Sequence, residues 1–393
     1  MKIVLNLNNL ILLLILNSNI LEAKEFEFNI LDNKINMYIS GYLGYKYIQP
    51  IPTSTKYDSI KSDPELGLLA SIKLTERLNI FNQFKYGTDI DEILVYNQID
   101  YTIDHNKLLK PVNNNLNISD LEIKLKAGKI RYDNNLYGNT RVNPRTRQGV
   151  FQPQGIYWNT LAQNITSGVG VGTDIKYKDL TLAYVITNPT IINQSKESSA
   201  WSTFNFKEMS AKFGDMQVAS LGYEIPKYGI KTKFAWSTLR MDAETQLSNG
   251  RVKAGQISLD MINAGIEYNL DDLTLSAETL ITKPNNQLNL KWNEFDKLSK
   301  GFSVTAQYDI NELVSVRTNY NEYYSTAKPP NPLQSYHNDF NIGLNYHQPN
   351  YMTNIEYHWM SGARIVDYDN FVADPNDYIH YGILAANIAY FFD

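Results

Sequence analysis

In Leu273-Thr274-Leu275-Ser276-Ala277-Glu278, apolar and polar residues alternate at every position. Successive side chains of a β-strand point to opposite faces, so this pattern predicts a strand with one apolar and one polar face. The sixteen segments that carry this alternation span residues 34–47, 65–75, 78–87, 93–103, 121–131, 168–177, 180–188, 217–225, 229–241, 257–270, 273–283, 300–310, 313–325, 335–348, 351–364 and 378–392. The sequence therefore predicts an all-β fold.

The connections between these segments alternate in length. Short turns fall at residues 75–78, 177–180, 226–229, 269–272, 309–312 and 347–350. Longer loops lie between them, at residues 48–64, 132–167, 189–216, 242–256, 284–299, 326–334 and 365–377, and only 104–120 is long where a short turn is expected. Outer-membrane barrels have this asymmetry, with short periplasmic turns and long extracellular loops. We therefore predict a transmembrane antiparallel β-barrel of about 16 strands with a wetted lumen. In the alternative, a soluble sandwich, the apolar stripes would face a packed core.

The composition agrees with a membrane barrel. The 393 residues include 28 Tyr but 15 Phe, and the mean hydropathy is -0.36. Tyr favours the membrane headgroup region because its ring is apolar and its hydroxyl polar. Eight tyrosines lie near the ends of predicted strands: Tyr45, Tyr47, Tyr177, Tyr268, Tyr308, Tyr346, Tyr351 and Tyr390. The absence of Cys excludes disulfides, thiolate zinc sites and cysteine nucleophiles, and a net charge of -5 without a basic run argues against a nucleic-acid partner.

The N-terminus has the features of a secretory signal. Lys2 precedes a run of apolar residues that is densest from Leu10 to Leu16, and Ala23 is a small residue at the expected cleavage point. A membrane anchor would need roughly 20 apolar residues, whereas five Asn residues interrupt this run. We expect residues 1–23 to be a cleaved signal peptide and residues 24–393 to be the barrel.

Two segments resemble parts of a known family. Leu384, Ala386, Ile388, Tyr390 and Phe392 form an alternating apolar strand that ends in an aromatic residue, with Asp393 added after it. The strand end 127–131, Ala-Gly-Lys-Ile-Arg, leads into the longest connection, residues 132–167. The first resembles the C-terminal assembly signal, and the second the entry to the constriction loop, of the general porins of Gram-negative outer membranes. This resemblance implies a homotrimer whose third loop folds into the lumen and narrows it, and passive diffusion of small hydrophilic solutes.

The candidate constriction loop, 132–167, is predominantly basic. Arg141, Arg145 and Arg147 lie within it and Arg131 at its start, against Asp133 alone. In a narrow aqueous pore with low-dielectric walls, such a cluster would attract anions. Alternatively, the loop lies on the rim, or its arginines pair with carboxylates of the wall.

The alternation also assigns charged side chains to the lumen, because Lys or Arg on the lipid side costs about 2–4 kcal/mol near the midplane. The residues assigned inward are Lys46, Lys73, Lys85, Lys124, Lys126, Lys176, Lys231, Lys233, Arg317, Asp100, Asp174, Glu224, Glu267, Glu278, Asp309 and Glu356. We take eight of them as candidate pore-wall residues: Lys124, Lys126, Lys231, Lys233, Glu267, Glu278, Arg317 and Glu356. The bases come mostly from earlier strands than the acids, so the pattern predicts a field across the pore.

Catalysis is not indicated. The five His residues are scattered, and no His-x-Ser stands on a predicted strand, as a serine hydrolase site would favour. His337 and Asp339 share one strand face near its outer end, but two polar neighbours there are expected by chance. Neither a cofactor nor a metal site is expected. The sequence favours a porin with an anion preference. The alternatives are a solute-selective channel for small anions such as carboxylates, and a non-conducting barrel that acts as an adhesin or structural surface protein.

Overall fold

The structure is a computed structural model that describes residues 24–30, 33–51, 61–87, 94–104, 120–136, 167–189, 208–246, 252–286, 299–325, 336–361 and 380–392. Its strands are β1 (Lys24–Ile30), β2 (Asn33–Ile51), β3 (Lys61–Lys73), β4 (Leu78–Gly87), β5 (Leu94–Ile103), β6 (Leu121–Arg131), β7 (Ser167–Tyr177), β8 (Leu180–Pro189), β9 (Glu208–Ile225), β10 (Ile230–Gln246), β11 (Val252–Leu270), β12 (Leu273–Asn286), β13 (Ser299–Asp309), β14 (Val314–Ser325), β15 (Tyr336–Gln348), β16 (Tyr351–Ser361) and β17 (His380–Phe392). A short 3-10 turn, η1 (Pro226–Tyr228), joins β9 to β10. Within the described residues, no helix has the length and apolarity needed to cross a membrane.

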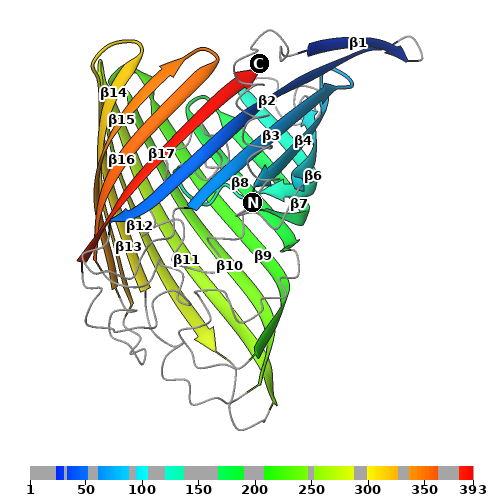
Figure 1. The fold of residues 1–393 in the computed structure, drawn as a ribbon. Helices are drawn as coiled ribbons and strands as arrows, with labels where there is room; N and C mark the ends of the chain where they lie inside the picture. Colours follow the sequence, from blue (N-terminus) through cyan, green and yellow to red (C-terminus); the bar gives the residue numbers. More distant parts are fainter. Residues whose placement is uncertain are drawn as a thin grey trace, which may run out of the picture.

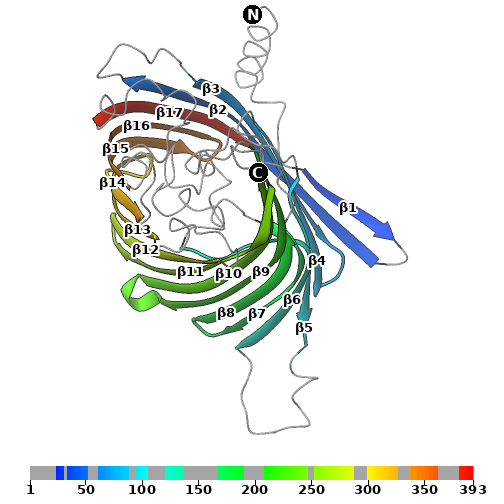
Figure 2. The same cartoon turned by 90° about the horizontal axis from the view of Figure 1, so that it is seen from below.

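Strands β2 to β17 form a closed barrel. Each pairs antiparallel with the next, and β17 pairs back onto β2 from Gly382↔Ile51 to Phe392↔Gly41. The strands slant around the barrel in Figure 1 and form a ring in Figure 2, seen along its axis. The prediction of an all-β, sixteen-stranded antiparallel barrel is therefore confirmed.

The sixteen predicted segments missed one strand. β1 pairs with residues 33–39 of β2 and adds a hairpin to the closed barrel. Its seven residues are too few to cross a membrane, which takes about 9–11 residues per strand. β1 is therefore not one of the membrane-spanning strands of the barrel wall.

The longest strands extend beyond their predicted ends. β9, β10 and β11 have 18, 17 and 19 residues, and all three continue further toward the long loops than the alternation indicated. The β9–β10 register shifts between Leu239 and Met241, which marks a bulge or irregularity. Such a shift puts two consecutive residues on one face and interrupts the alternation. The extra residue stands on β9, between Phe213 and Met216, directly before residue 217 where the predicted segment begins.

The two faces of the wall follow the predicted phase. On β12, Leu275 is 39% exposed on the outer side, whereas Ser276 is 8% exposed on the inner side. Ile281 shares the outer phase and Glu278 the inner one. Large apolar side chains are exposed on the outside of every strand from β3 to β16, among them Val171, Ile266 and Trp359. The outer surface is therefore an apolar band.

Short turns gather at one rim, which we call the short-turn rim. Two-residue turns join β7 to β8 and β11 to β12, with Lys178 at φ 52° and Asp271 at φ 44°. Positive φ at the first turn residue gives a backbone twist that matches the twist of paired strands. At Gly229, φ is 62°, and a Cβ would collide with the carbonyl oxygen of Asn269. The other ends of the strands form the long-loop rim.

Candidate pore interior

The chain enters the lumen directly after β6. The hydroxyl of Tyr132 lies 2.6 Å from that of Thr187 on β8, and Asp133 forms an ion pair with Lys233 on β10. The backbone N–H of Leu136 donates to Glu278 Oε1 on β12 at 2.9 Å. Thr187, Lys233 and Glu278 are all on the inner phase of their strands. Residues 132–136 therefore run along the inner wall from β8 to β12, as the first part of a lumen loop would.

Two glycines allow close backbone approaches here, one at the end of β6 and one beside residues 132–136. Gly128 on β6 has φ 114°, and a Cβ there would collide with the carbonyl oxygen of Asn97 on β5. A side chain at this position would strain the strand end, which gives a physical reason for the Gly in the 127–131 motif. On β11, a Cβ at Gly265 would lie 3.1 Å from Leu136 Cβ. Gly265 thus leaves room for the loop to lie close against the wall.

The candidate constriction residues that the structure describes, Arg131 and Asp133, have different partners on the wall. Arg131 has its guanidinium 5.8 Å from the centre of the Tyr96 ring on β5. Asp133 lies at Lys233. Arg141, Arg145 and Arg147 fall outside the described residues. Asp133 thus contacts the wall at β10, whereas Arg131 lies at the end of β6, where the loop begins.

Four of the eight lysines assigned to the inner wall have a carboxylate within 3.6 Å: Lys85, Lys124, Lys126 and Lys233. Lys126 on β6 forms an ion pair with Asp174 on β7, and Lys124 Nζ lies 3.6 Å from Glu122 Oε1. Between β3 and β4, Glu65 Oε1 lies 3.4 Å from Lys85 Nζ, a diagonal pair in the register. These contacts favour the interpretation that wall cations pair with wall carboxylates. The local field of this wall is therefore weaker than its lysines alone would produce.

Three further wall charges lie near the short-turn rim. Lys231 on β10 stands opposite Glu224 on β9 and opposite Glu267 on β11 in the strand register. Glu267 also accepts a hydrogen bond from the side-chain amide of Asn269 at 3.1 Å. The register therefore gives Lys231 an acidic neighbour on each side.

A buried chain of alternating charges crosses β14, β15 and β16. Arg317 forms an ion pair with Glu356, whose other oxygen lies 3.2 Å from His358 Nε2. His358 Nδ1 lies 3.0 Å from Asp339 Oδ2, and Asn321 donates to the same oxygen at 3.1 Å. Ionised carboxylates only accept hydrogen bonds, so His358 satisfies both contacts when both of its ring nitrogens carry a proton. The chain then reads Arg⁺, Glu⁻, His⁺, Asp⁻ and is neutral overall.

This chain changes the role assigned to two candidate pore-wall residues. Arg317 and Glu356 face inward as predicted, but their side chains are 3% and 0% exposed. Buried and paired, they link β14 to β16 across β15 and contact little water. Glu278 is also buried, and it holds the loop backbone. The inward face was predictable from alternation, whereas the partners were not, because they depend on register across several strands.

His337 and Asp339, which share one strand face, do not hydrogen-bond to each other as a catalytic pair would. Asp339 contacts His358 on the next strand, and the ring nitrogens of buried His337 have no hydrogen-bond partner among the described residues. Nor do the described His, Asp and Glu residues form a group that could hold a metal ion. His358 is the residue that sequence reasoning missed. Its signal was its inner phase on a strand adjacent to Asp339.

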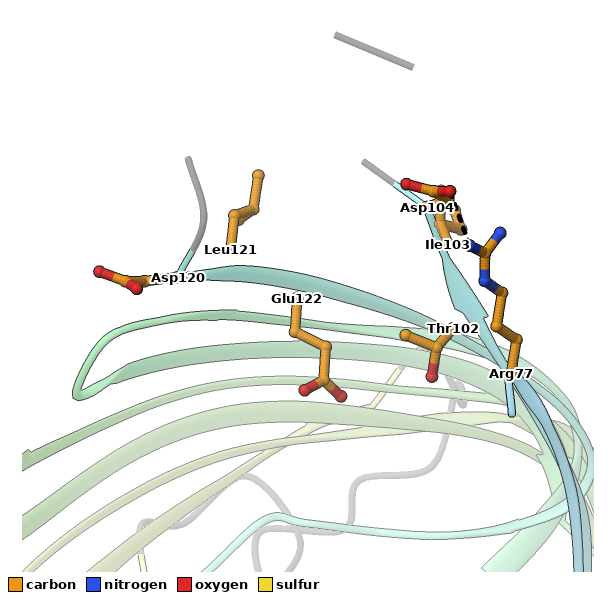
Figure 3. Close-up of a pocket in the computed structure, with 7 residues that line it drawn as sticks. All are labelled: Arg77, Thr102, Ile103, Asp104, Asp120, Leu121 and Glu122. Carbon is orange, nitrogen blue, oxygen red and sulfur yellow. Dashed lines mark hydrogen bonds and ion pairs between the residues drawn. The ribbon is translucent and has the colours of Figure 1, made fainter. Parts of the chain in front are cut away.

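A separate pocket opens at the short-turn rim, between the ends of β5 and β6. Figure 3 shows its lining, with Arg77 from the β3–β4 turn reaching Asp104, and Asp120 and Glu122 on the opposite side. Arg77 Nη2 lies 2.6 Å from Asp104 Oδ2. The pocket marks the place where connection 104–120 is long although a short turn was expected. Its lining offers one ion pair and two further carboxylates, an arrangement that suits a solvated rim.

Comparison with known proteins finds similar structures but no similar sequences. No protein-family model matches the chain, and no curated protein matches it in sequence. Among solved structures, an anion-selective porin from Comamonas acidovorans aligns with a TM-score of 0.56 and 9% identity, over 91% of this chain and 100% of the other. The chain has the porin fold. OmpF of Salmonella typhi, solved with daunomycin, aligns at 0.55 and 14% identity over 93% and 100%. OmpT of Vibrio cholerae, an outer membrane protein in a trimer form, aligns at 0.57 and 10% over 91% and 99%.

Proposed function

We propose that the protein is an outer-membrane porin through which small hydrophilic solutes diffuse passively. The observation that carries this proposal is the path of residues 132–136 inside a closed sixteen-stranded barrel, fastened to β8, β10 and β12. A loop held in this way narrows the aqueous path, and selection then follows from the size and charge of the remaining opening. Transport of this kind needs neither a cofactor nor energy coupling.

The proposed location is the outer membrane of a Gram-negative bacterium, reached after removal of residues 1–23. The apolar outer band and the outer-membrane proteins that share the fold support this location. We also propose a homotrimer, which the trimer form of the Vibrio cholerae protein supports. Residues 1–23 lie outside the described part of the chain, so the signal peptide stays a prediction.

An anion preference is proposed from the charges of the loop. Arg141, Arg145 and Arg147 carry three positive charges that stay protonated at any accessible pH. Their acidic neighbour in the sequence, Asp133, is paired with Lys233 and adds little negative potential. Charges within a Debye length of a permeating ion, about 10 Å at 0.1 M salt, are only weakly screened. The net charge of -5 would by itself favour cations, so the measured selectivity discriminates between the local and the overall charge.

The test is conductance in a planar bilayer. We expect ohmic single-channel steps and, in a KCl gradient, a reversal potential that shows chloride passing in preference to potassium. Replacing Arg141, Arg145 and Arg147 together with Glu should invert the sign of that potential. Arg240→Glu is a suitable control, because Arg240 is exposed and lies 3.6 Å from Asp215 near the long-loop end of β10.

Each contrary outcome has a distinct meaning. A folded barrel without conductance would contradict the porin function and favour the alternative of an adhesin or structural surface protein. A saturable current for carboxylates would identify the solute-selective channel. A cation-selective wild type, or a triple variant that behaves like Arg240→Glu, would remove the three arginines from the selectivity filter.

A further inference from the structure

The β1–β2 hairpin leaves the barrel at the short-turn rim. β17 pairs with β2 only as far as Gly41, and β1 takes over the same edge of β2 from Ile39 to Asn33. In Figures 1 and 2 the hairpin extends sideways from this rim, away from the barrel axis. It therefore lies roughly along the plane that the membrane surface would occupy.

The base of the hairpin is firmly packed. On the inner side, Tyr42 joins Met352, Ala389 and Phe391 in a buried cluster, with the Tyr42 and Phe391 ring centres 6.1 Å apart. On the outer side, the ring of Phe392 covers Gly41, where an added Cβ would lie 2.6 Å from Phe392 Cζ. The direction in which the hairpin leaves is thus fixed by packing on both faces of the wall.

The register gives the hairpin one apolar and one polar face. Phe26 pairs with Met37, and Phe28 with Ile35, whereas Glu27 pairs with Asn36. Directly paired positions of an antiparallel sheet share a face. Four apolar positions therefore fall together on one face, and the alternating polar positions fall on the other.

The apolar face continues the lipid-facing surface of the barrel. Met37 pairs with Ile72 on β3, and the same phase of β2 reaches Leu43, which pairs with outward-facing Leu66. The polar phase continues the lumen side, where exposure changes sharply. Tyr42 is 4% exposed inside the barrel, whereas Tyr38, four residues earlier on the same phase, is 40% exposed. The lumen side thus opens to water at the point where the hairpin leaves the wall.

From these observations we propose that the β1–β2 hairpin is a membrane-surface contact. Its apolar face lies in the headgroup region of the periplasmic leaflet and its polar face in the periplasm. A wall strand that bends outward turns its lipid side toward the bilayer and its lumen side toward water, so the bend produces the orientation that the two faces require. Apolar side chains gain about 25 cal/mol per Å² on leaving water. We expect this face to contact lipid because it is continuous with the lipid-facing surface of the barrel wall. The proposal requires the outer-membrane location but not conduction.

Single cysteines can test the orientation, since the chain has none of its own. Met37→Cys and Tyr38→Cys lie one residue apart on opposite faces, and each would carry an environment-sensitive fluorophore in vesicles of phosphatidylethanolamine and phosphatidylglycerol. Leu275→Cys and Ser276→Cys serve as references for the lipid side and the lumen side of the wall. The heat-modified mobility of each variant checks that its barrel has folded, and Ile35→Cys replaces Met37→Cys if the latter does not fold.

The expected result is a blue-shifted probe at 37 with quenching by shallow nitroxide lipids several-fold stronger than at 38, and the reverse order with aqueous iodide. Equal quenching at 37 and 38, with normal references at 275 and 276, would overturn the proposal and leave the barrel and the porin function intact. A probe at 37 that neither quencher reaches would also overturn it, and would indicate a second copy of the chain on this face.

Discussion

The attachment of the loop to the wall can be tested at Glu278. This carboxylate is buried on β12 and accepts the backbone N–H of Leu136 at 2.9 Å. A hydrogen bond to a charged group contributes about 1.5–3 kcal/mol. Glu278→Ala should therefore weaken the attachment of the start of the loop to the wall by a similar free energy. Since 1.4 kcal/mol corresponds to a factor of ten, the fraction of time that residues 132–136 spend away from the wall should rise by about ten- to a hundredfold.

Open-channel current in a planar bilayer reports this change. The wild type should give quiet steps, and Glu278→Ala should give excess noise with brief partial closures. Glu267→Ala is the matched control, because it removes the same charge from the inner face of neighbouring β11, where the carboxylate accepts a hydrogen bond from Asn269 rather than from the loop. Noise and conductance equal in the two variants would refute the reasoning, since charge removal alone would then explain both.

Two further predictions concern the loop contact and the closure of the barrel. Leu136→Cys with Gly265→Cys should form a disulfide under mild oxidation, because the two Cβ atoms would lie 3.1 Å apart, close to the 3.5–4.5 Å that disulfides require. Leu136→Cys with Ile266→Cys, one residue further and on the lipid side, should stay reduced, and equal cross-linking in a mobility assay would contradict the lumen path. Phe392→Ala should lower the amount of heat-modifiable barrel, since truncating a packed Phe costs about 3–5 kcal/mol. Deletion of Asp393 should not, and equal folding of both variants would show that the aromatic end is dispensable.

The sequence was sufficient for the barrel because alternation and loop length are local signals. Leu275 and Ser276 face opposite sides as their order predicts, and the short and long connections separate to opposite rims, with 104–120 as the exception. The hairpin strand β1 was missed because it is short and adds no wall strand. The part of β9 before residue 217 was concealed where the extra residue between Phe213 and Met216 interrupts the alternation.

The partners inside the lumen could not be predicted in the same way. Asp133 and Lys233 are 100 residues apart, and the Leu136–Glu278 contact spans 142. Such pairs depend on the stagger of every strand between them, which no local pattern encodes. The inner face of Glu278 was therefore predictable, whereas its use as a support for the loop was not.

This distinction bears on selectivity. The sequence predicted a field across the pore, with bases on early strands and acids on later ones. In the structure, Lys85, Lys126 and Lys233 each have a carboxylate in contact, and Arg317 is buried against Glu356. A charge and its partner a few ångströms apart act at a distance as a dipole, whose potential falls faster than that of a single charge. A permeating anion would therefore feel the paired wall weakly, and any strong preference has to come from charges that the wall does not neutralise.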